Sequence, residues 1–156
     1  MPPDVQITPM TRADIDAIFR AFVSWNKTRG QYEHYYAENE AGQRVTFVAR
    51  RNGHVIGYSN VLWVSDYAPF TQAGIPEISD LNVVVEAQKQ GVGTAPIEAC
   101  EAAMRHAGKR TVGIGVGQTD DYENAQRLYP QLGYVYEDAP PVSTPWGDTR
   151  YLTKRL

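Results

Sequence analysis

The pair Asn52-Gly53 separates two runs rich in β-branched and aromatic residues, Val45 to Arg50 and His54 to Val64. Both residues of the pair tolerate the positive φ angles that the two central positions of a type I′ turn require. The spacing therefore predicts a β-hairpin, which would place two long neighbouring strands in the middle of the chain.

Helical and strand patterns surround this hairpin. Apolar residues at helical spacing predict four helices, at Ile15–Val23, Tyr32–Tyr36, Ile97–Met104 and Asp120–Leu132. Further strands are predicted at Val5–Thr8, Ile78–Val85, Arg110–Gly117, Tyr134–Tyr136 and Thr149–Thr153, and Pro69–Pro76 is predicted to be a loop. This order predicts one α/β (α+β) domain over residues 1–156, with a mixed sheet of about seven strands flanked by about four helices.

Composition excludes several classes of protein. A hydrophobic content of 42% and a single cysteine argue against a disordered or disulfide-stabilised chain. A net charge of −3 without clustered Lys and Arg argues against nucleic-acid binding, and no apolar run is long enough to span a membrane. The start, Met1-Pro2-Pro3-Asp4, lacks the basic and apolar regions of a signal peptide. The sequence thus predicts a cytoplasmic protein.

The segment Gln88-Lys89-Gln90-Gly91-Val92-Gly93-Thr94 joins an apolar strand to a helix. Backbone N–H groups at such a helix start have no intrahelical partners, and the glycines let a ligand approach the main chain closely. A phosphate could therefore bind there, although many such turns are only tight connections. The segment lacks the Gly-Lys-Ser/Thr of a Walker loop, and Pro96 replaces the third glycine of a dinucleotide fingerprint.

Four pieces of sequence resemble the GNAT superfamily of N-acetyltransferases. Gln88 to Gly93 matches the family's Gln/Arg-x-x-Gly-x-Gly/Ala pyrophosphate loop, and Leu81-Asn82-Val83 resembles the strand that pairs with the pantetheine arm. The segment from Ala125 to Tyr134 resembles the family's Ala-x-x-Leu-Tyr helix and following strand, and the central hairpin also fits. The resemblance covers nearly the whole chain.

The resemblance implies acetyl-CoA as the acyl donor. The residues expected to bind it are Leu81, Asn82, Val83, Gln88, Lys89, Gln90, Gly91, Val92, Gly93 and Thr94. The family usually has Asn where this chain has Tyr122, so a Tyr122 hydroxyl is the expected substitute for that contact. No metal site is predicted, because the histidines lack partners at metal-ligand spacing.

The chemistry requires a base for the acceptor ammonium and an acid for the leaving thiolate. Glu77 precedes Gln88 by eleven residues, an offset that resembles the catalytic glutamate of the histone-acetylating branch. Asp80 and a water molecule are the alternatives; on a regular strand Glu77 and Asp80 face opposite sides unless a bulge intervenes. Tyr129 resembles the family's general acid, and a packing tyrosine is the structural alternative.

The expected acceptor is a primary amine of a small molecule or peptide. The resemblance also indicates which segments of this chain shape the acceptor pocket. These segments contain Tyr32, His34, Tyr35, Tyr36, Trp63, Asp66, Tyr67 and Trp146. Aromatic rings with carboxylates at their edge suit a cationic amine, although the same rings would also suit a core or a homodimer interface. A catalytically silent acyl-CoA-binding module that regulates a partner is the alternative function.

Overall fold

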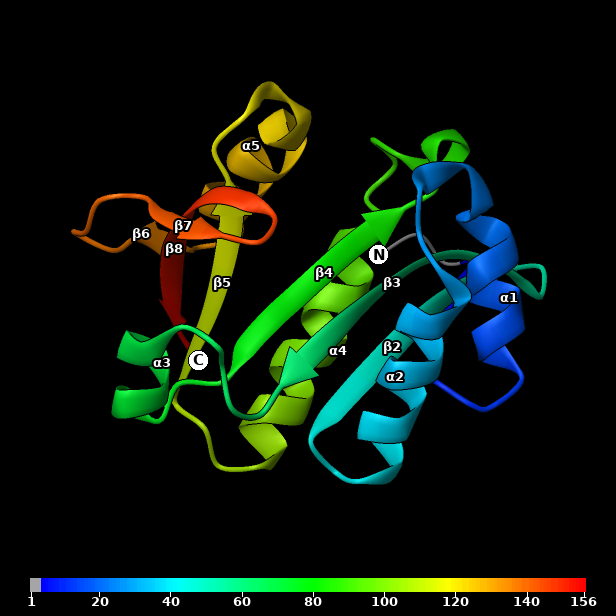
Figure 1. The fold of residues 1–156 in the computed structure, drawn as a ribbon, viewed down its shortest axis with the longest axis horizontal. Coiled ribbons are helices and arrows are strands. Elements are labelled where there is room, and N and C mark those ends of the chain that lie inside the picture. The colour runs from blue at the N-terminus through cyan, green and yellow to red at the C-terminus, as the bar shows by residue number, and fades with distance from the viewer. Residues whose placement is uncertain (1–3) are drawn as a thin grey trace.

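The computed structural model describes residues 4–156, and the prediction about a signal peptide falls on residues 1–4, of which 1–3 lie outside the described residues. One mixed sheet contains the strands in the order β1-β2-β3-β4-β5-β8-β6, with β7 paired to β8 (Figure 1). The strands are β1 (Val5–Pro9), β2 (Arg44–Arg51), β3 (His54–Leu62), β4 (Glu77–Val83), β5 (Thr111–Gly117), β6 (Val135–Tyr136), β7 (Val142–Thr144) and β8 (Gly147–Arg155). The α-helices are α1 (Asp14–Ala21), α2 (Arg29–Glu40), α3 (Ala68–Ala73), α4 (Thr94–His106) and α5 (Glu123–Gln131).

The central hairpin is confirmed. β2 and β3 pair antiparallel up to Arg51 and His54, and the two turn residues, Asn52 and Gly53, have φ angles of 52° and 78°. Both angles lie in the left-handed region, as the type I′ turn requires.

The described residues hold eight strands and five α-helices, one more of each than the sequence predicts. The additional helix, α3, lies in the segment predicted as a loop, where Pro69 lies in the first turn and Gly74 ends the helix at a φ of 69°. The additional strand is β7. In addition, β4 ends at Val83 and not at Val85, because residues 85–87 form a 3-10 turn.

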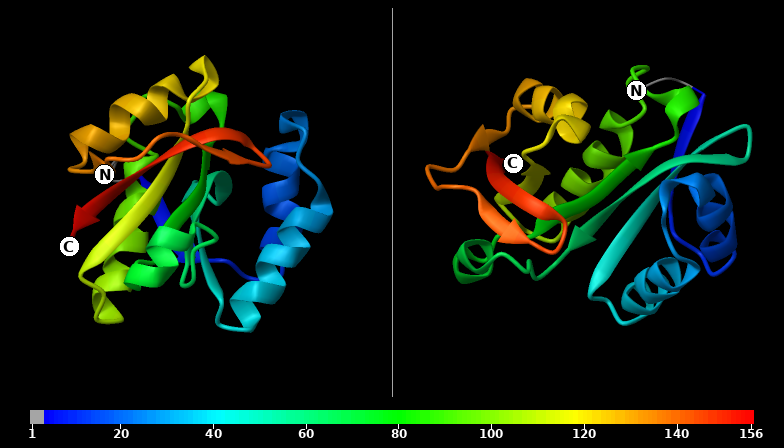
Figure 2. Two further views of the ribbon diagram at one scale, coloured as in Figure 1. Left: turned by 60° about the vertical axis from the view of Figure 1, so that its left-hand side comes forward. Right: turned by 45° about the horizontal axis from the view of Figure 1, so that its top comes forward.

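Helices cover both faces of the sheet. Figure 2 shows α1 and α2 on one face and α4 on the other. Under α4, the core is built from residues such as Ile78, Ile97, Met104 and Ile114. Under α1 and α2, it is built around Ile18, Phe22, Tyr32, Val48 and Tyr58. No helix in residues 4–156 combines the length and apolar character needed to cross a membrane.

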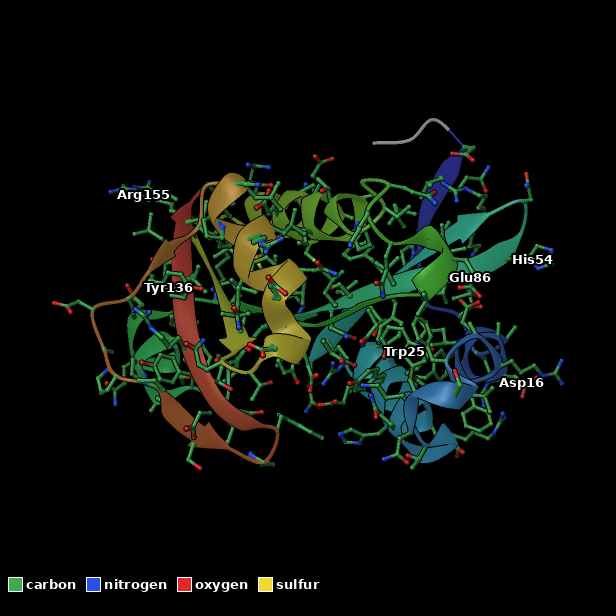
Figure 3. All side chains as sticks on the ribbon, turned by 90° about the horizontal axis from the view of Figure 1, so that it is seen from above. Asp16, Trp25, His54, Glu86, Tyr136 and Arg155 are labelled. Carbon is green, nitrogen blue, oxygen red and sulfur yellow. The ribbon has the colours of Figure 1, made fainter. Side chains whose placement is uncertain are left out.

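The two middle strands, β4 and β5, diverge. They run parallel, but they pair only at Glu77 with Gly113 and at Ile78 with Ile114. Beyond this point the strands separate toward their carboxyl ends, which gives the sheet a V-shaped opening (Figure 1). Figure 3, seen from above, shows the turn after β4 near Glu86 with α5 on one side and the α1–α2 pair on the other.

Candidate active site

The register of the sheet defines which side chains share the face under α2. Arg44 of β2, Leu62 of β3 and Glu77 of β4 are consecutive cross-strand partners, so they form one row. Thr46, two residues along from Arg44, accepts a hydrogen bond from the side chain of Asn39 on α2. Because residues i and i+2 of a strand point to the same face, the row that contains Glu77 also faces α2.

A bulge in β4 changes the expected placement of Asp80. Between two paired positions β3 advances by two residues, from Tyr58 to Asn60, while β4 advances by three, from Ser79 to Asn82. The extra residue leaves Asp80 with a φ of 56°, a left-handed conformation that aspartate tolerates better than most residues. This is the bulge that the sequence left open as an alternative, so Glu77 and Asp80 do not face opposite sides: Asp80 turns toward α2, the face that Glu77 already shares.

Asp80 is the centre of a polar network under α2. Its carboxylate accepts hydrogen bonds from the hydroxyls of Tyr35 at 2.7 Å and Tyr58 at 3.1 Å, and from the amide of Asn82 at 2.7 Å. The Gln31 amide lies at 3.2 Å, and the Lys27 ammonium at 3.6 Å. These donors occupy most of the lone pairs of the carboxylate.

Glu77 has a different environment. The hydroxyl of Ser65 donates a hydrogen bond of 2.5 Å to its carboxylate. Burial is the main cause that raises the pKa of Glu77 to about 7, with the nearby charge of Asp66 adding to the shift and the Ser65 hydrogen bond and Arg44 opposing it. A carboxyl group with this pKa is ionised in an appreciable fraction of molecules at neutral pH and can still accept a proton.

Tyr129 of α5 is 5% exposed and packs in the core cluster under α4. Burial raises the pKa of Tyr129 well above its usual range, and the negative charge of Asp80 raises it further. The hydroxyl therefore stays protonated at neutral pH and can act as a proton donor.

The predicted phosphate loop precedes α4. Lys89 and Gly91 have φ angles of 62° and 78°, so the loop turns twice through the left-handed region. Among the turn and loop hydrogen bonds of residues 4–156, none takes its donor from the N–H groups of residues 89–94. These N–H groups lie at the positive end of the α4 dipole, which makes the loop suited to an anion.

The side chains of Gln88 and Gln90 hold this loop to its surroundings. The Gln88 amide donates a hydrogen bond of 2.9 Å to the carbonyl of Val83, and the Gln90 amide donates one of 3.0 Å to the carbonyl of Glu86. The Gln90 side-chain oxygen also accepts a bond from Arg51. The two glutamines therefore order the loop, and its main chain is left to face a ligand.

An apolar wall continues from the loop into the opening. A Cβ on Gly93 would lie 3.6 Å from Val83, 3.8 Å from Leu81 and 3.9 Å from Leu128, so these side chains converge on the start of α4. Leu128 was not among the predicted site residues, although it belongs to the Ala-x-x-Leu-Tyr motif. Together β4, α4 and α5 form a wall suited to an apolar arm that follows a phosphate.

Alternating glycines of β5 accommodate aromatic rings. A Cβ on Gly113 would lie 2.2 Å from the ring of Phe70, and one on Gly117 would lie 2.3 Å from the ring of Tyr122. Tyr122, 40% exposed, thus packs against the end of β5. Its role as a cofactor contact stays a prediction.

The predicted acceptor residues are only partly brought together. A cavity of about 570 Å³ has His34, Trp63 and Asp66 in its lining. Four other residues lie elsewhere: Tyr32 is buried in the core, Tyr36 contacts Arg12 and Glu40, Tyr67 stacks on Tyr151, and Trp146 is 83% exposed in the turn between β7 and β8. Tyr35 lies beside the cavity, with the Arg44 guanidinium 4.0 Å from its ring.

Sequence reasoning missed six of the nine residues that line this cavity, and the two that matter most for the site are Arg44 and Leu62. Both lie at strand ends, where a charged residue and an aliphatic residue are unremarkable. Their place beside Glu77 depends on the pairing register of three strands. Counting back from the hairpin turn does not give this register, because the pairing shifts by one residue between Ala49 and Arg50 and the count would place Val61 opposite Arg44.

The family assignment follows from a match over most of the chain. Residues 12–134 match the model of the acetyltransferase (GNAT) family. The chain therefore belongs to the GNAT family of acetyltransferases, and the expectation from its motifs is confirmed. The donor of this family is acetyl-CoA. A search of curated protein sequences finds no match.

Solved structures share the fold at low sequence identity. The protein yncA of Salmonella typhimurium, solved with its cofactor acetyl-CoA, is 22% identical, with a TM-score of 0.75 over 98% of this chain and 94% of that one. A ribosomal-protein-alanine N-acetyltransferase from Brucella melitensis is 19% identical, with a TM-score of 0.76 over 97% and 99%. The ribosomal-protein-S18-alanine N-acetyltransferase of Escherichia coli is 18% identical, with a TM-score of 0.73 over 97% and 94%. These similarities confirm the fold.

Proposed function

We propose that this protein transfers an acetyl group from acetyl-CoA to a primary amine of a small molecule or peptide by direct attack. In this reaction the amine nitrogen forms a bond to the thioester carbon, the carbon–sulfur bond breaks, and CoA leaves as the thiol. The observation that carries the proposal is the half-buried Glu77 carboxyl, with its pKa raised to about 7, at the point where β4 and β5 diverge.

The described residues fit the donor. The free N–H groups of residues 89–94 suit the pyrophosphate, and the wall of Leu81, Val83 and Leu128 suits the pantetheine arm. Asn82 contributes main-chain groups to the same strand, while its side chain is held by Tyr58 and Asp80. A backbone N–H near Val83 would polarise the thioester carbonyl.

Glu77 is proposed as the general base and Tyr129 as the general acid. The amine must lose a proton to attack, and Glu77 can take this proton either directly or through a water molecule. Tyr129 keeps its proton at neutral pH because burial and Asp80 both disfavour the phenolate, so it can protonate the leaving thiolate. The two groups thus have opposite protonation states at the start of the reaction.

Asp80 is proposed as a positioning residue. Its carboxylate already accepts hydrogen bonds from Tyr35, Tyr58 and Asn82, so taking a proton from a substrate would displace one of these donors. The network fixes the bulge of β4 against α2. It thereby sets the direction of the main-chain N–H groups that follow Asp80.

The experiment that tests the proposal measures free thiol release from acetyl-CoA with a panel of primary amines. Turnover that depends on the amine supports it. Binding of acetyl-CoA without turnover for any amine, in the presence of a folded protein, would overturn the proposal and favour a catalytically silent acyl-CoA-binding module.

A further inference from the structure

A positive group that lines the cavity and a negative group belong to one row of side chains across three strands. Arg44 and Glu77 belong to one cross-strand row, with Leu62 between them. Since neighbouring strands lie roughly 4.8 Å apart, the two backbones are separated by roughly 10 Å. No ion pair within 4.0 Å joins the two side chains in residues 4–156, although the charge of Arg44 does influence Glu77. The space above Leu62 therefore separates a guanidinium from a carboxyl.

The Arg44 guanidinium is buried and incompletely bonded. The residue is 8% exposed; its Nε donates to Glu38 at 3.1 Å, and its Cζ lies 4.0 Å from the centre of the Tyr35 ring. Its Nη1 has no hydrogen-bond partner within the described part of the chain. A buried charged donor without an acceptor is costly, so this nitrogen calls for an acceptor that the protein itself does not provide.

The cavity beside this guanidinium has the size of a small molecule. Its volume is about 570 Å³, and both Arg44 and Leu62 line it. Glu38, which also lines it, is held by Arg44 and by the Nε2 of His34 at 3.1 Å. Glu38 is therefore already engaged at the Arg44 end of the cavity.

The charges are distributed unequally along the cavity. Asp66 lines the cavity at the end nearer Glu77, since the preceding residue, Ser65, donates a hydrogen bond to Glu77, and the charge of Asp66 disfavours ionisation of that carboxyl. The guanidinium of Arg44 lies at the opposite end of the row. An acceptor with an ammonium at one end and a carboxylate a few ångströms away would match both ends.

We propose that the acceptor is a free amino acid, whose carboxylate binds Arg44 while its α-amine lies at Glu77. The inference rests on the proposed acetyl transfer and names the substrate class for the same site. Leu62 and Trp63 form the apolar part of the cavity that the amino-acid side chain would contact. A peptide amino terminus offers only a neutral carbonyl at the position of the carboxylate, so it would use the guanidinium less well.

The test uses matched sets of three amines. For phenylalanine, leucine and histidine, kcat/KM is measured for the L-amino acid, for its primary amide and for the amine that lacks the carboxyl group. In at least one of the three sets, we expect kcat/KM for the amino acid to exceed that for the decarboxylated amine by roughly 10- to 100-fold. The reason is that the decarboxylated amine loses a charged hydrogen bond. The amide should be intermediate.

Variants of Arg44 connect this preference to one side chain. Arg44→Gln should raise KM for the preferred amino acid by roughly 10-fold or more and leave KM for the decarboxylated amine within about twofold. Arg44→Lys should recover part of the loss, since it keeps the charge without the planar fork. Arg50→Gln is the control: Arg50 is also on β2 and pairs with buried Asp14, so it affects stability without touching the cavity.

The outcomes separate the two proposals. Equal or better transfer to the decarboxylated amines, or an amide that matches the amino acid, would overturn the assignment while leaving acetyl transfer intact. Turnover with amines that carry no carboxylate, but with no free amino acid, would also overturn it. Failure of acetyl transfer itself would appear as no thiol release with any amine. The comparison of wild-type substrates decides the question even if Arg44→Gln does not fold.

Discussion

The hydroxyl of Tyr35 on α2 donates a 2.7 Å hydrogen bond to the carboxylate of Asp80 in the bulge of β4. This bond joins the helix that covers one face of the sheet to the strand that lines the V-shaped opening. Burial and the nearby Asp80 raise the pKa of Tyr35 far above its usual range, so the hydroxyl remains a donor at all physiological pH values. The position of α2 and the geometry of the bulge are thus coupled through two side chains.

Tyr35→Phe should destabilise the protein by about 2 kcal/mol, because it removes a charge-assisted hydrogen bond from a half-buried carboxylate. The measurement is chemical denaturation of both proteins. Tyr36→Phe is the matched control, since the neighbouring hydroxyl bonds to Glu40 in an exposed position. Equal stability of the two variants would show that the Tyr35–Asp80 bond contributes little.

Gly91→Val should abolish the rise in melting temperature caused by acetyl-CoA. Gly91 has a φ of 78°, so the substitution strains the loop and places a side chain where the main chain would approach the pyrophosphate. Gly108→Val, at a φ of 81° after α4, imposes a similar backbone strain of about 1–2 kcal/mol far from the loop. If both variants keep the acetyl-CoA shift of the wild type, the phosphate-loop assignment is wrong.

Local sequence signals were sufficient for much of the fold. Asn52-Gly53 predicted the hairpin because only a few residues tolerate two consecutive positive φ angles, and the strand–glycine–helix order around Gly91 placed α4 correctly. The family motifs depend on similarly short spacings. Such features are encoded within about ten residues, so they can be read without knowing the tertiary structure.

The features that sequence reasoning missed depend on contacts between distant segments. Helix α3 has only six residues and is held by Phe70. The ring of Phe70 occupies the space that Gly113 leaves on β5. The bulge at Asp80 depends on partners from α2 and β3, which alternation along β4 cannot reveal. For the same reason, the juxtaposition of Arg44 with Glu77 requires the register of three strands.

Tyr129→Phe should lower turnover by roughly tenfold or more and change acetyl-CoA affinity little, because the ring remains and only the proton donor is lost. The measurement is kcat with a saturating acceptor, together with the acetyl-CoA thermal shift. Tyr134→Phe provides the comparison, since this buried hydroxyl donates to Glu101 at 2.7 Å and serves stability. Unchanged turnover in Tyr129→Phe would assign the residue to packing.

Glu77→Gln should keep the fold and acetyl-CoA binding, and should lower the rate at neutral pH by roughly 100-fold. In the wild type the rate should rise with pH as Glu77 ionises near its pKa of about 7. The deficit of the variant should shrink at high pH, where more of the acceptor amine is already neutral. Measuring both proteins with one acceptor over the same pH range cancels the ionisation of the amine.

The raised pKa of Glu77 also predicts a pH-dependent difference in stability. Its pKa is about 7 in the folded protein against an ordinary value of 4.5. The stabilising contribution of this group to the free energy of unfolding is therefore fully present below pH 4.5 and is lost as the pH rises through 7. Glu77→Gln does not titrate, so its melting temperature relative to the wild type should increase between pH 5 and pH 8. Ser65→Ala removes the hydrogen bond that lowers this pKa, so it should move the rate profile to higher pH. Two results together would exclude Glu77 as the group that titrates. In the first, Ser65→Ala has the same pH–rate profile as the wild type. In the second, the difference in melting temperature between Glu77→Gln and the wild type does not change with pH.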